Sequence, residues 1–308
     1  ILSGNWLKNH LKHLNWGKIP IMTVSNSILG HHGMFTGEKM IDHPKIFESW
    51  EPYRNEFRAL IFAYFQPKTW VPENFKDNSS VGLLLSGLLV LSDWIASNDK
   101  LFNRIEGSET ILDIQKYFSQ SKKTAKIAVE SLGFNYSANL TDFINFSDIW
   151  PDFTSLTSIQ QICKNYLSDL SGNKLIIIEA PMGEGKTEAA LYLSTRFLKN
   201  WKGFYFALPT MATSNQMYGR IYSFLHKIIP TMKENLQLVH GMAWMIDKFS
   251  HESTSLHEEA YDWFKPKKRS LLAPFGVGTI DQCLMSVLWV KFGFLRLLGL
   301  TGKILKVI

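Results

Sequence analysis

One glycine-rich segment constrains the fold of this chain more than any other. Residues 180–187 read Ala-Pro-Met-Gly-Glu-Gly-Lys-Thr, and they stand between an apolar run at 175–178 and a helical pattern at 188–198. A glycine-rich turn between a strand and a helix is typical of phosphate binding, because its backbone N–H groups and the helix dipole both favour an anion. The sequence therefore predicts a strand–loop–helix unit, with its strand at 175–179.

The side chains of this loop fit a nucleotide. Lys186 is placed to reach the β- and γ-phosphates, and the Thr187 hydroxyl is placed to ligate Mg²⁺. The general pattern begins with glycine, whereas this loop begins with Ala180. We interpret the loop as an ATP–Mg²⁺ site made by Ala180, Pro181, Met182, Gly183, Glu184, Gly185, Lys186 and Thr187.

Strand and helix patterns alternate over residues 158–308. Strand-like runs are expected at 175–179, 203–208, 236–239, 271–277 and 303–308. Strands that alternate with helices favour a parallel sheet covered on both faces. Ligands of such sheets bind beyond the carboxyl ends of the strands, so the segments that follow the strands should share one rim.

The first part of the chain is helical in pattern. Leu7, Leu11 and Leu14 keep a helical period, and further helices are expected at 81–97 and 114–132. Residues 136–157 are rich in polar residues and suit a linker. The predicted class is thus α + α/β, with a helical domain at 1–135, a linker at 136–157 and an α/β domain at 158–308.

Composition places modest limits on the environment and the partners. The net charge of +6 leans towards a polyanionic partner, although such an excess also suits an ordinary surface. Cys163 and Cys283 are distant in sequence and resemble core thiols of a reducing, cytoplasmic compartment. The apolar run at 81–91 is too short to span a bilayer, so no membrane partner is expected.

A histidine pair and one aspartate form the second candidate site. Gly30-His31-His32-Gly33 offers two imidazoles at a tight bend, although two exposed loop histidines would look the same. Asp93 lies in a stretch that is apolar nearly all round, so it is expected to be buried beside a metal, an N–H group or an arginine. Two imidazoles and a carboxylate suit Mn, Fe, Co, Ni or Zn.

Three further segments are candidates for contacts with nucleotide or nucleic acid. Gln160 could bond to adenine, or it could be a solvated helix residue. Segments 208–215 and 277–282 each follow a strand and open a helix. Their hydroxyl and N–H groups suit backbone phosphates, although capped helix starts alone would show the same pattern. The candidate nucleic-acid contacts are Pro209, Thr210, Thr213, Gly278 and Thr279.

Taken in order and spacing, these motifs resemble the CRISPR-associated nuclease–helicase of type I interference systems. That family joins an HD-type metal nuclease to a superfamily 2 helicase, whose first RecA-like domain would correspond to 158–308. The resemblance implies that His31, His32 and Asp93 are metal ligands of the nuclease and that Lys186 belongs to helicase motif I. It further implies that Gln160 contacts adenine, and that Thr210 and Thr279 belong to the strand-gripping motifs Ia and Ib.

The implied activity is ATP-driven translocation on single-stranded DNA, coupled to metal-dependent cutting. The implied partner is the RNA-guided CRISPR surveillance complex. The family's His-Asp pair does not occur in this sequence, and its acidic motif II and second RecA-like domain would follow residue 308. We therefore expect an incomplete piece that is inactive alone. The alternatives are a helicase fragment whose helical N-terminal part only binds partners, and a catalytically silent binding module.

Overall fold

A computed structural model describes about two thirds of the chain. The described residues are 7–8, 11–12, 17–33, 49–66, 79–102, 114–134, 145–165, 172–198, 202–229, 236–239, 263–264 and 268–308. Part of the helical pattern near residue 14 and the start of the predicted linker lie outside these ranges. The chain divides into two compact units: unit 1 comprises 1–130 and 287–298, and unit 2 comprises 131–286 and 299–308.

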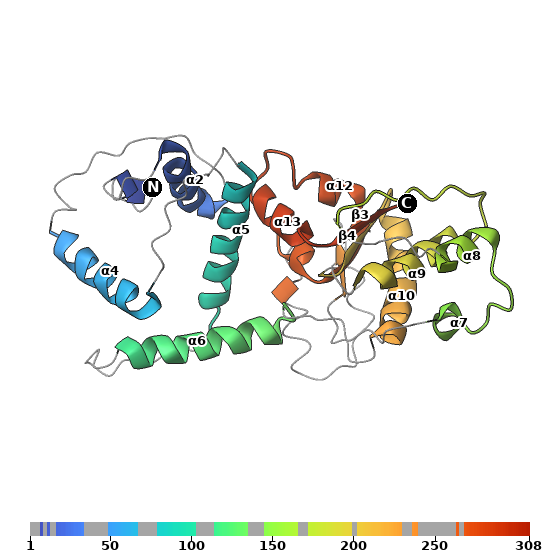
Figure 1. The fold of residues 1–308 in the computed structure, drawn as a ribbon, viewed down its shortest axis with the longest axis horizontal. Coiled ribbons are helices and arrows are strands. Elements are labelled where there is room, and N and C mark those ends of the chain that lie inside the picture. Colours follow the sequence, from blue (N-terminus) through green and yellow to red (C-terminus); the bar gives the residue numbers. More distant parts are fainter. Residues whose placement is uncertain are drawn as a thin grey trace. The chain divides into compact units, whose positions relative to one another are not determined.

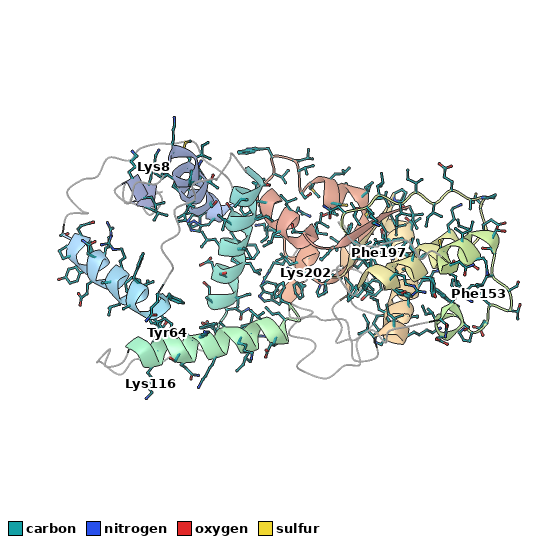
Figure 2. All side chains as sticks on the ribbon, viewed as in Figure 1. Lys8, Tyr64, Lys116, Phe153, Phe197 and Lys202 are labelled. Carbon is teal, nitrogen blue, oxygen red and sulfur yellow. The ribbon has the colours of Figure 1, made fainter. Side chains whose placement is uncertain are left out.

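Unit 1 is helical in its described part (Figure 1). The predicted helices at 81–97 and 114–132 are confirmed as α5 and α6. Helix α5 packs on α2, where the Ser27 hydroxyl donates to the Gly82 carbonyl at 2.9 Å. Tyr64, which Figure 2 labels, stacks on Phe118 of α6 with ring centroids 4.7 Å apart. The elements are α2 (Lys18–Leu29), η1 (Gly30–His32), α4 (Glu51–Phe65), α5 (Ser79–Ala96) and α6 (Ile114–Ser131).

Unit 1 also includes a segment from much later in the chain. Residues 287–298 belong to it, together with the first part of α13 (Gly293–Leu300). A Cβ added at Gly87 of α5 would lie 2.9 Å from Leu298 Cβ, so helix α13 approaches α5 closely. The domain bounds predicted from sequence place this segment in the second domain, whereas the structure groups it with the helices of unit 1.

Unit 2 is built on a four-stranded parallel sheet with the order β2-β3-β1-β4. The strand patterns at 203–208, 236–239 and 303–308 are confirmed to within about a residue at each end. Leu208 pairs with Thr279 in register, so strands β1 and β3 end side by side. The strands are β1 (Phe204–Leu208), β2 (Leu236–Val239), β3 (Phe275–Thr279) and β4 (Ile304–Val307).

Two strand predictions were wrong in whole or in part. The described residues 173–181 form neither helix nor strand, and Leu175 and Ile177 are 87% and 72% exposed. An apolar run is only a candidate strand until a neighbouring strand pairs with it, and the described sheet ends at β4. The run at 271–277 begins as the 3₁₀ helix η4 (Ser270–Leu272), and β3 starts only after Pro274, which has no N–H to donate.

Helices cover the sheet on the side of its larger core. Phe204 and Phe206 point to that side, where they meet side chains of α9 and α10, whereas Tyr205 and Ala207 point to a smaller cluster on the other face. Phe146, within the predicted linker, is buried in the larger core. The helices of unit 2 are α7 (Phe146–Ile149), α8 (Ser158–Asn165), α9 (Lys186–Leu198), α10 (Met211–Ile228) and α12 (Ile280–Leu284), as seen in Figure 1. Of these, α12 packs its Cys283 in the smaller cluster on the other face.

Two composition-based expectations concern the thiols and the membrane. Cys163 and Cys283 are both buried free thiols, as predicted, and burial raises the pKa of each. Among the helices of the described residues, none has the length and apolar character needed to cross a membrane.

Candidate nucleotide and metal sites

The phosphate loop has the backbone that its glycines predict. Gly183 and Gly185 have φ values of +86° and +70°, in the left-handed region that other residues rarely occupy. Helix α9 begins at Lys186, so the N–H groups of its first turn have no partner within the helix. A loop of this shape at a helix N-terminus is suited to an anion. The strand that was expected before it is absent, as described above.

The ammonium group of Lys186 lies folded over this loop. Its Nζ donates to the carbonyl of Ala180, and to that of Pro181 at 2.9 Å. These two carbonyls belong to the loop itself, so the lysine is held close to where a bound phosphate would sit. A phosphate oxygen would be a charged acceptor in place of neutral carbonyls, and charge-assisted hydrogen bonds are the stronger kind.

The loop is supported from behind by the start of α8. The Thr157 hydroxyl donates to the Glu184 carbonyl at 2.8 Å. Gln160 is 2% exposed, and its Oε1 accepts from Thr157 N–H at 3.1 Å, so it is not the solvated helix residue that was one alternative. A Cβ added at Gly185 would lie 2.1 Å from Gln160 Nε2. The positive φ favours glycine at 185, and a Cβ there would also force the Gln160 amide to shift.

The predicted nucleic-acid contacts lie at one rim of the sheet. Thr210 caps α10 by accepting from Thr213 N–H at 3.2 Å, and Thr213 is exposed. Gly278 precedes Thr279 in β3, where a Cβ would lie 2.1 Å from the Val239 carbonyl. Thr279 is 6% exposed and precedes α12, whereas Pro209 is exposed. The parallel register brings the ends of β1 and β3 together, as predicted.

An ion pair links the helix of the phosphate loop to the helix after β1. Glu188, which follows Thr187 in α9, accepts a hydrogen bond from the Arg220 guanidinium of α10. The side chain of Glu188 is 13% exposed and that of Arg220 is 51% exposed. The pair therefore ties together the two helices that start at the candidate ATP and nucleic-acid segments.

The histidine pair forms the short helix η1 at the end of α2. The rings of His31 and His32 lie close together and tilted by 39° to each other, with centroids 3.9 Å apart. His31 Nδ1 lies against the Ile28 carbonyl, which can only accept, so in the neutral imidazole this contact selects the tautomer with the proton on Nδ1 and the lone pair on Nε2. A metal-binding histidine is commonly oriented by a carbonyl in this way, so the donor chemistry of the turn fits a metal.

The prediction that Asp93 is buried was wrong. Helix α5 buries Ser86, Gly87 and Val90. Asp93 stands seven residues after Ser86, close to the same stripe of the helix, yet it is exposed near the helix end. A sequence that is apolar nearly all round does not indicate how far along the helix the rest of the fold covers it, and a solvated carboxylate needs no buried partner. Helix α5 packs against η1, but the part of the chain that the structure describes contains no group of three His, Cys, Asp or Glu side chains able to hold a metal.

Sequence reasoning missed two supporting residues, Thr157 and Phe292. Thr157 and Gln160 form a Thr-x-x-Gln capping pair at the start of α8, and that spacing was a readable signal. Phe292 donates its N–H to the Gly33 carbonyl at 2.8 Å, immediately after the histidine pair. No local sequence pattern predicts a contact between residues so far apart in sequence.

Comparison with known proteins places these motifs in a family. Residues 2–102 match the family model of the Cas3 HD domain. The CRISPR-associated endonuclease/helicase Cas3 of Thermus thermophilus is 32% identical over 235 residues, which are 72% of this chain and 25% of that protein. The chain thus spans about a quarter of this relative's length.

Solved structures give the same result. The crystal structure of T. fusca Cas3 with AMPPNP superposes with a TM-score of 0.81 at 27% identity, over 99% of this chain and 35% of that one. A chain of a CRISPR RNA-guided surveillance complex in a pre-nicking state gives a TM-score of 0.61 at 26% identity, over 99% of this chain and 31% of that one. The chain therefore belongs to the Cas3 family of CRISPR-associated nuclease–helicases.

Proposed function

We propose that this chain is part of an ATP-dependent single-stranded DNA translocase coupled to a metal-dependent HD-type nuclease in type I CRISPR interference. In this proposal unit 1 holds the HD-type nuclease elements, and the sheet of unit 2 is the first RecA-like helicase domain. The family assignment, the parallel sheet and the helical unit support it.

The observation that carries the helicase part is the phosphate loop. Its left-handed glycines, the helix start at Lys186 and the ammonium folded over the loop form a site for the phosphates of ATP. Lys186 would neutralise the β- and γ-phosphates, Thr187 would ligate Mg²⁺, and Gln160 Nε2 faces the loop from behind. A T. fusca relative was solved with AMPPNP, which is consistent with a nucleotide at this loop.

The nuclease part of the proposal rests on Asp93 and on the histidine turn, by which we mean residues Gly30–Gly33. We propose that His31, His32 and Asp93 supply part of a ligand set for a divalent transition metal, with Mn, Fe, Co, Ni or Zn as candidates. A bound metal would activate water for attack on the scissile phosphate. Within the chain, the contact between His31 Nδ1 and the Ile28 carbonyl leaves Nε2 as the ring nitrogen whose lone pair would bind the metal.

Residues at the rim of the sheet would contact the backbone of the single-stranded DNA. Pro209, Thr210, Thr213, Gly278 and Thr279 would hold the DNA backbone through N–H and hydroxyl groups, without reading sequence. Because the contacts go to phosphates, binding should weaken as salt rises. The similar chain in the surveillance complex supports an RNA-guided complex as the partner that delivers the opened strand.

The test separates cutting from ATP hydrolysis in the full-length gene product. Asp93→Ala is expected to lower metal-dependent cutting of single-stranded DNA at least about 100-fold, because even outer-shell partners of a metal ligand are worth about 10- to 100-fold. DNA-stimulated ATP hydrolysis should stay unchanged. Asp99→Ala, at another exposed aspartate near the end of α5, is the control and should affect neither activity. Parallel loss of both activities in Asp93→Ala would contradict the proposal.

Two observations favour the alternative, a helicase whose helical N-terminal part is not catalytic. Asp93 is exposed, and the described residues contain no three-ligand group. Under that alternative His31, His32 and Asp93 bind no ion. Metal analysis of the purified full-length protein and of its His32→Ala variant distinguishes the two, because only the nuclease proposal expects a difference in metal content.

A further inference from the structure

Phe292 touches the chain directly beside the histidine pair. Its N–H donates to the Gly33 carbonyl at 2.8 Å, and Gly33 closes η1 by donating its own N–H to the Gly30 carbonyl at 2.9 Å. Gly33 has φ +108°, and a Cβ there would lie 2.8 Å from Phe292 Cε2. Gly33, at the end of the histidine turn, therefore packs closely against Phe292.

The ring of the same residue reaches the other candidate ligand element. Phe292 lies on Trp94 with ring centroids 5.3 Å apart, and Trp94 is the residue after Asp93 in α5. Phe292 thus contacts the residue after His32 through its backbone and the residue after Asp93 through its ring. All of these residues belong to unit 1.

The backbone of Phe292 is held in an unfavourable conformation. Its φ is +63°, a value that costs free energy for a residue with a Cβ. Such residues persist where the surroundings determine them, often at functional sites. Phe292 is only 8% exposed, and its carbonyl accepts from Leu295 N–H at the start of α13 at 3.1 Å. Glycine would fit this φ more easily, but it would bring no ring to Trp94.

We infer that Phe292 is a positioning residue of the metal site, which fixes the spacing between the histidine turn and the Asp93 end of α5. This inference rests on the proposed nuclease function. Residue 292 lies outside the region that matches the HD-domain family model, and it follows the motif Ib segment in the chain. The nuclease elements would then depend on a segment flanked on both sides by the sequence of unit 2.

The test measures metal affinity rather than cutting alone. Co²⁺ is titrated into the metal-free full-length gene product, without nucleotide, and binding is followed by its visible absorption. Phe292→Leu keeps an apolar side chain and the N–H group, but it removes the ring from Trp94. We expect its affinity for Co²⁺ to fall about 10- to 100-fold, the range for residues that orient metal ligands. DNA-stimulated ATP hydrolysis, measured on the same preparation, should stay within about twofold of wild type.

The matched control is the same change at a neighbouring buried phenylalanine. Phe294 is 5% exposed, and its ring centroid lies 6.1 Å from that of Phe292. Phe294→Leu should leave Co²⁺ affinity within about threefold of wild type. If Phe292→Leu does not fold, Trp94→Leu tests the same ring contact, and Trp94→Phe should restore the affinity that Trp94→Leu loses.

The possible outcomes separate this inference from the proposed function. Equal losses in Phe292→Leu and Phe294→Leu, or no loss in Phe292→Leu, would overturn the positioning role while leaving the metal site in place. If wild-type protein shows no Co²⁺ binding that depends on His31, His32 and Asp93, both the metal site and the positioning role are wrong. A selective loss in Phe292→Leu, with ATP hydrolysis preserved, supports the inference.

Discussion

A single hydroxyl joins the phosphate loop to the helix behind it. Thr157 Oγ1 donates to the Glu184 carbonyl at 2.8 Å, between the two left-handed glycines. One intramolecular hydrogen bond contributes about 0.5–1.5 kcal/mol. Thr157→Val should therefore weaken binding of a fluorescent ATP analogue by about 2- to 10-fold, and Thr157→Ser should restore it. The measurement is a fluorescence titration of the full-length gene product.

A control separates positioning of the loop from simple capping of α8. Thr157 also accepts from Gln160 N–H at 3.4 Å, and loss of a helix N-cap costs about 1 kcal/mol of stability. The thermal unfolding midpoint is measured for both variants. A lower midpoint of Thr157→Val with unchanged nucleotide affinity would mean that Thr157 acts only as a cap.

Residue-scale predictions succeeded where the chemistry is local. The glycine-rich turn and the helix after it, predicted at 188–198 and found from Lys186, follow from a short motif, because each depends on neighbouring residues. The burial of Asp93 was predicted wrongly, since exposure depends on how far along α5 the rest of the fold covers the helix. The contact from Phe292 to Gly33 joins distant parts of the chain and left no local signal.

At the scale of elements, strand β4 and the turn before it carry two lysines whose pKa values are lowered by burial of their amino groups. Lys303 Nζ donates to the Leu271 carbonyl at 2.7 Å and to the Ala273 carbonyl, and burial lowers the pKa of Lys303 to about 7. Lys306 Nζ lies 4.6 Å from the centre of the Phe204 ring, and burial lowers the pKa of Lys306 well below its ordinary value. Burial therefore disfavours the charged form of each amine in the folded state.

The sign of the pH dependence follows from Lys303. Its pKa is about 7 when folded and 10.5 in its ordinary state, so the unfolded chain binds more protons between these values. The free energy of unfolding should therefore increase as the pH rises from about 7 towards 10.5. It should decrease again as the pH is lowered towards 7. The thermal midpoint of the purified chain, measured from pH 7 to 9, should rise. Lys303→Met should reduce this slope without abolishing it, because Lys306 acts in the same direction.

The control is an exposed lysine close to the same turn. Lys202, labelled in Figure 2, is exposed and donates its backbone N–H to the Gly302 carbonyl at 2.7 Å. Lys202→Met should leave the slope of midpoint against pH as in wild type. A slope that is equally steep in Lys303→Met and wild type would show that Lys303 does not titrate in this range.

Strand predictions succeeded or failed according to how much each strand depends on partners. The predicted runs that form β1 and β2 pair with other strands of the sheet, and all residues of both strands are buried. The apolar run at 175–179 is largely exposed. An apolar composition alone does not provide a neighbouring strand with which such a run can pair. The late start of β3 reflects Pro274, a local signal that the apolar pattern of 271–277 concealed.

At the scale of the whole molecule, the sequence motifs gave the order of the functional segments but not their grouping. The helical part and the sheet part were predicted from periodicity. The assignment of 287–298 to unit 1 depends on packing between α13 and α5, at contacts such as that of Leu298 with Gly87. A division of the chain by sequence alone would separate Phe292 from the histidine turn.

The last prediction concerns what the chain does by itself. It supplies the loop N–H groups, Lys186 and Thr187, so it should bind the phosphates of ATP. Phosphoryl transfer also needs an acid to hold Mg²⁺ and an arginine to offset charge, and such an arginine is worth about 10³–10⁵ in rate. Three arginines in the described part of unit 2 are engaged elsewhere: Arg220 pairs with Glu188, and Arg196 and Arg269 lie over Tyr192 and Trp263.

We therefore expect the purified chain to release phosphate from ATP at least about 10³-fold more slowly than the full-length gene product, with or without single-stranded DNA. Lys186→Ala should abolish the residual binding of an ATP analogue, because it removes the ammonium that lies over the loop. The control, Lys202→Met, changes an exposed lysine remote from the loop in sequence and should bind the analogue as wild type does. DNA-stimulated release at a rate close to that of the full-length protein, lost in Lys186→Ala, would show that unit 2 completes the hydrolytic site with its own residues.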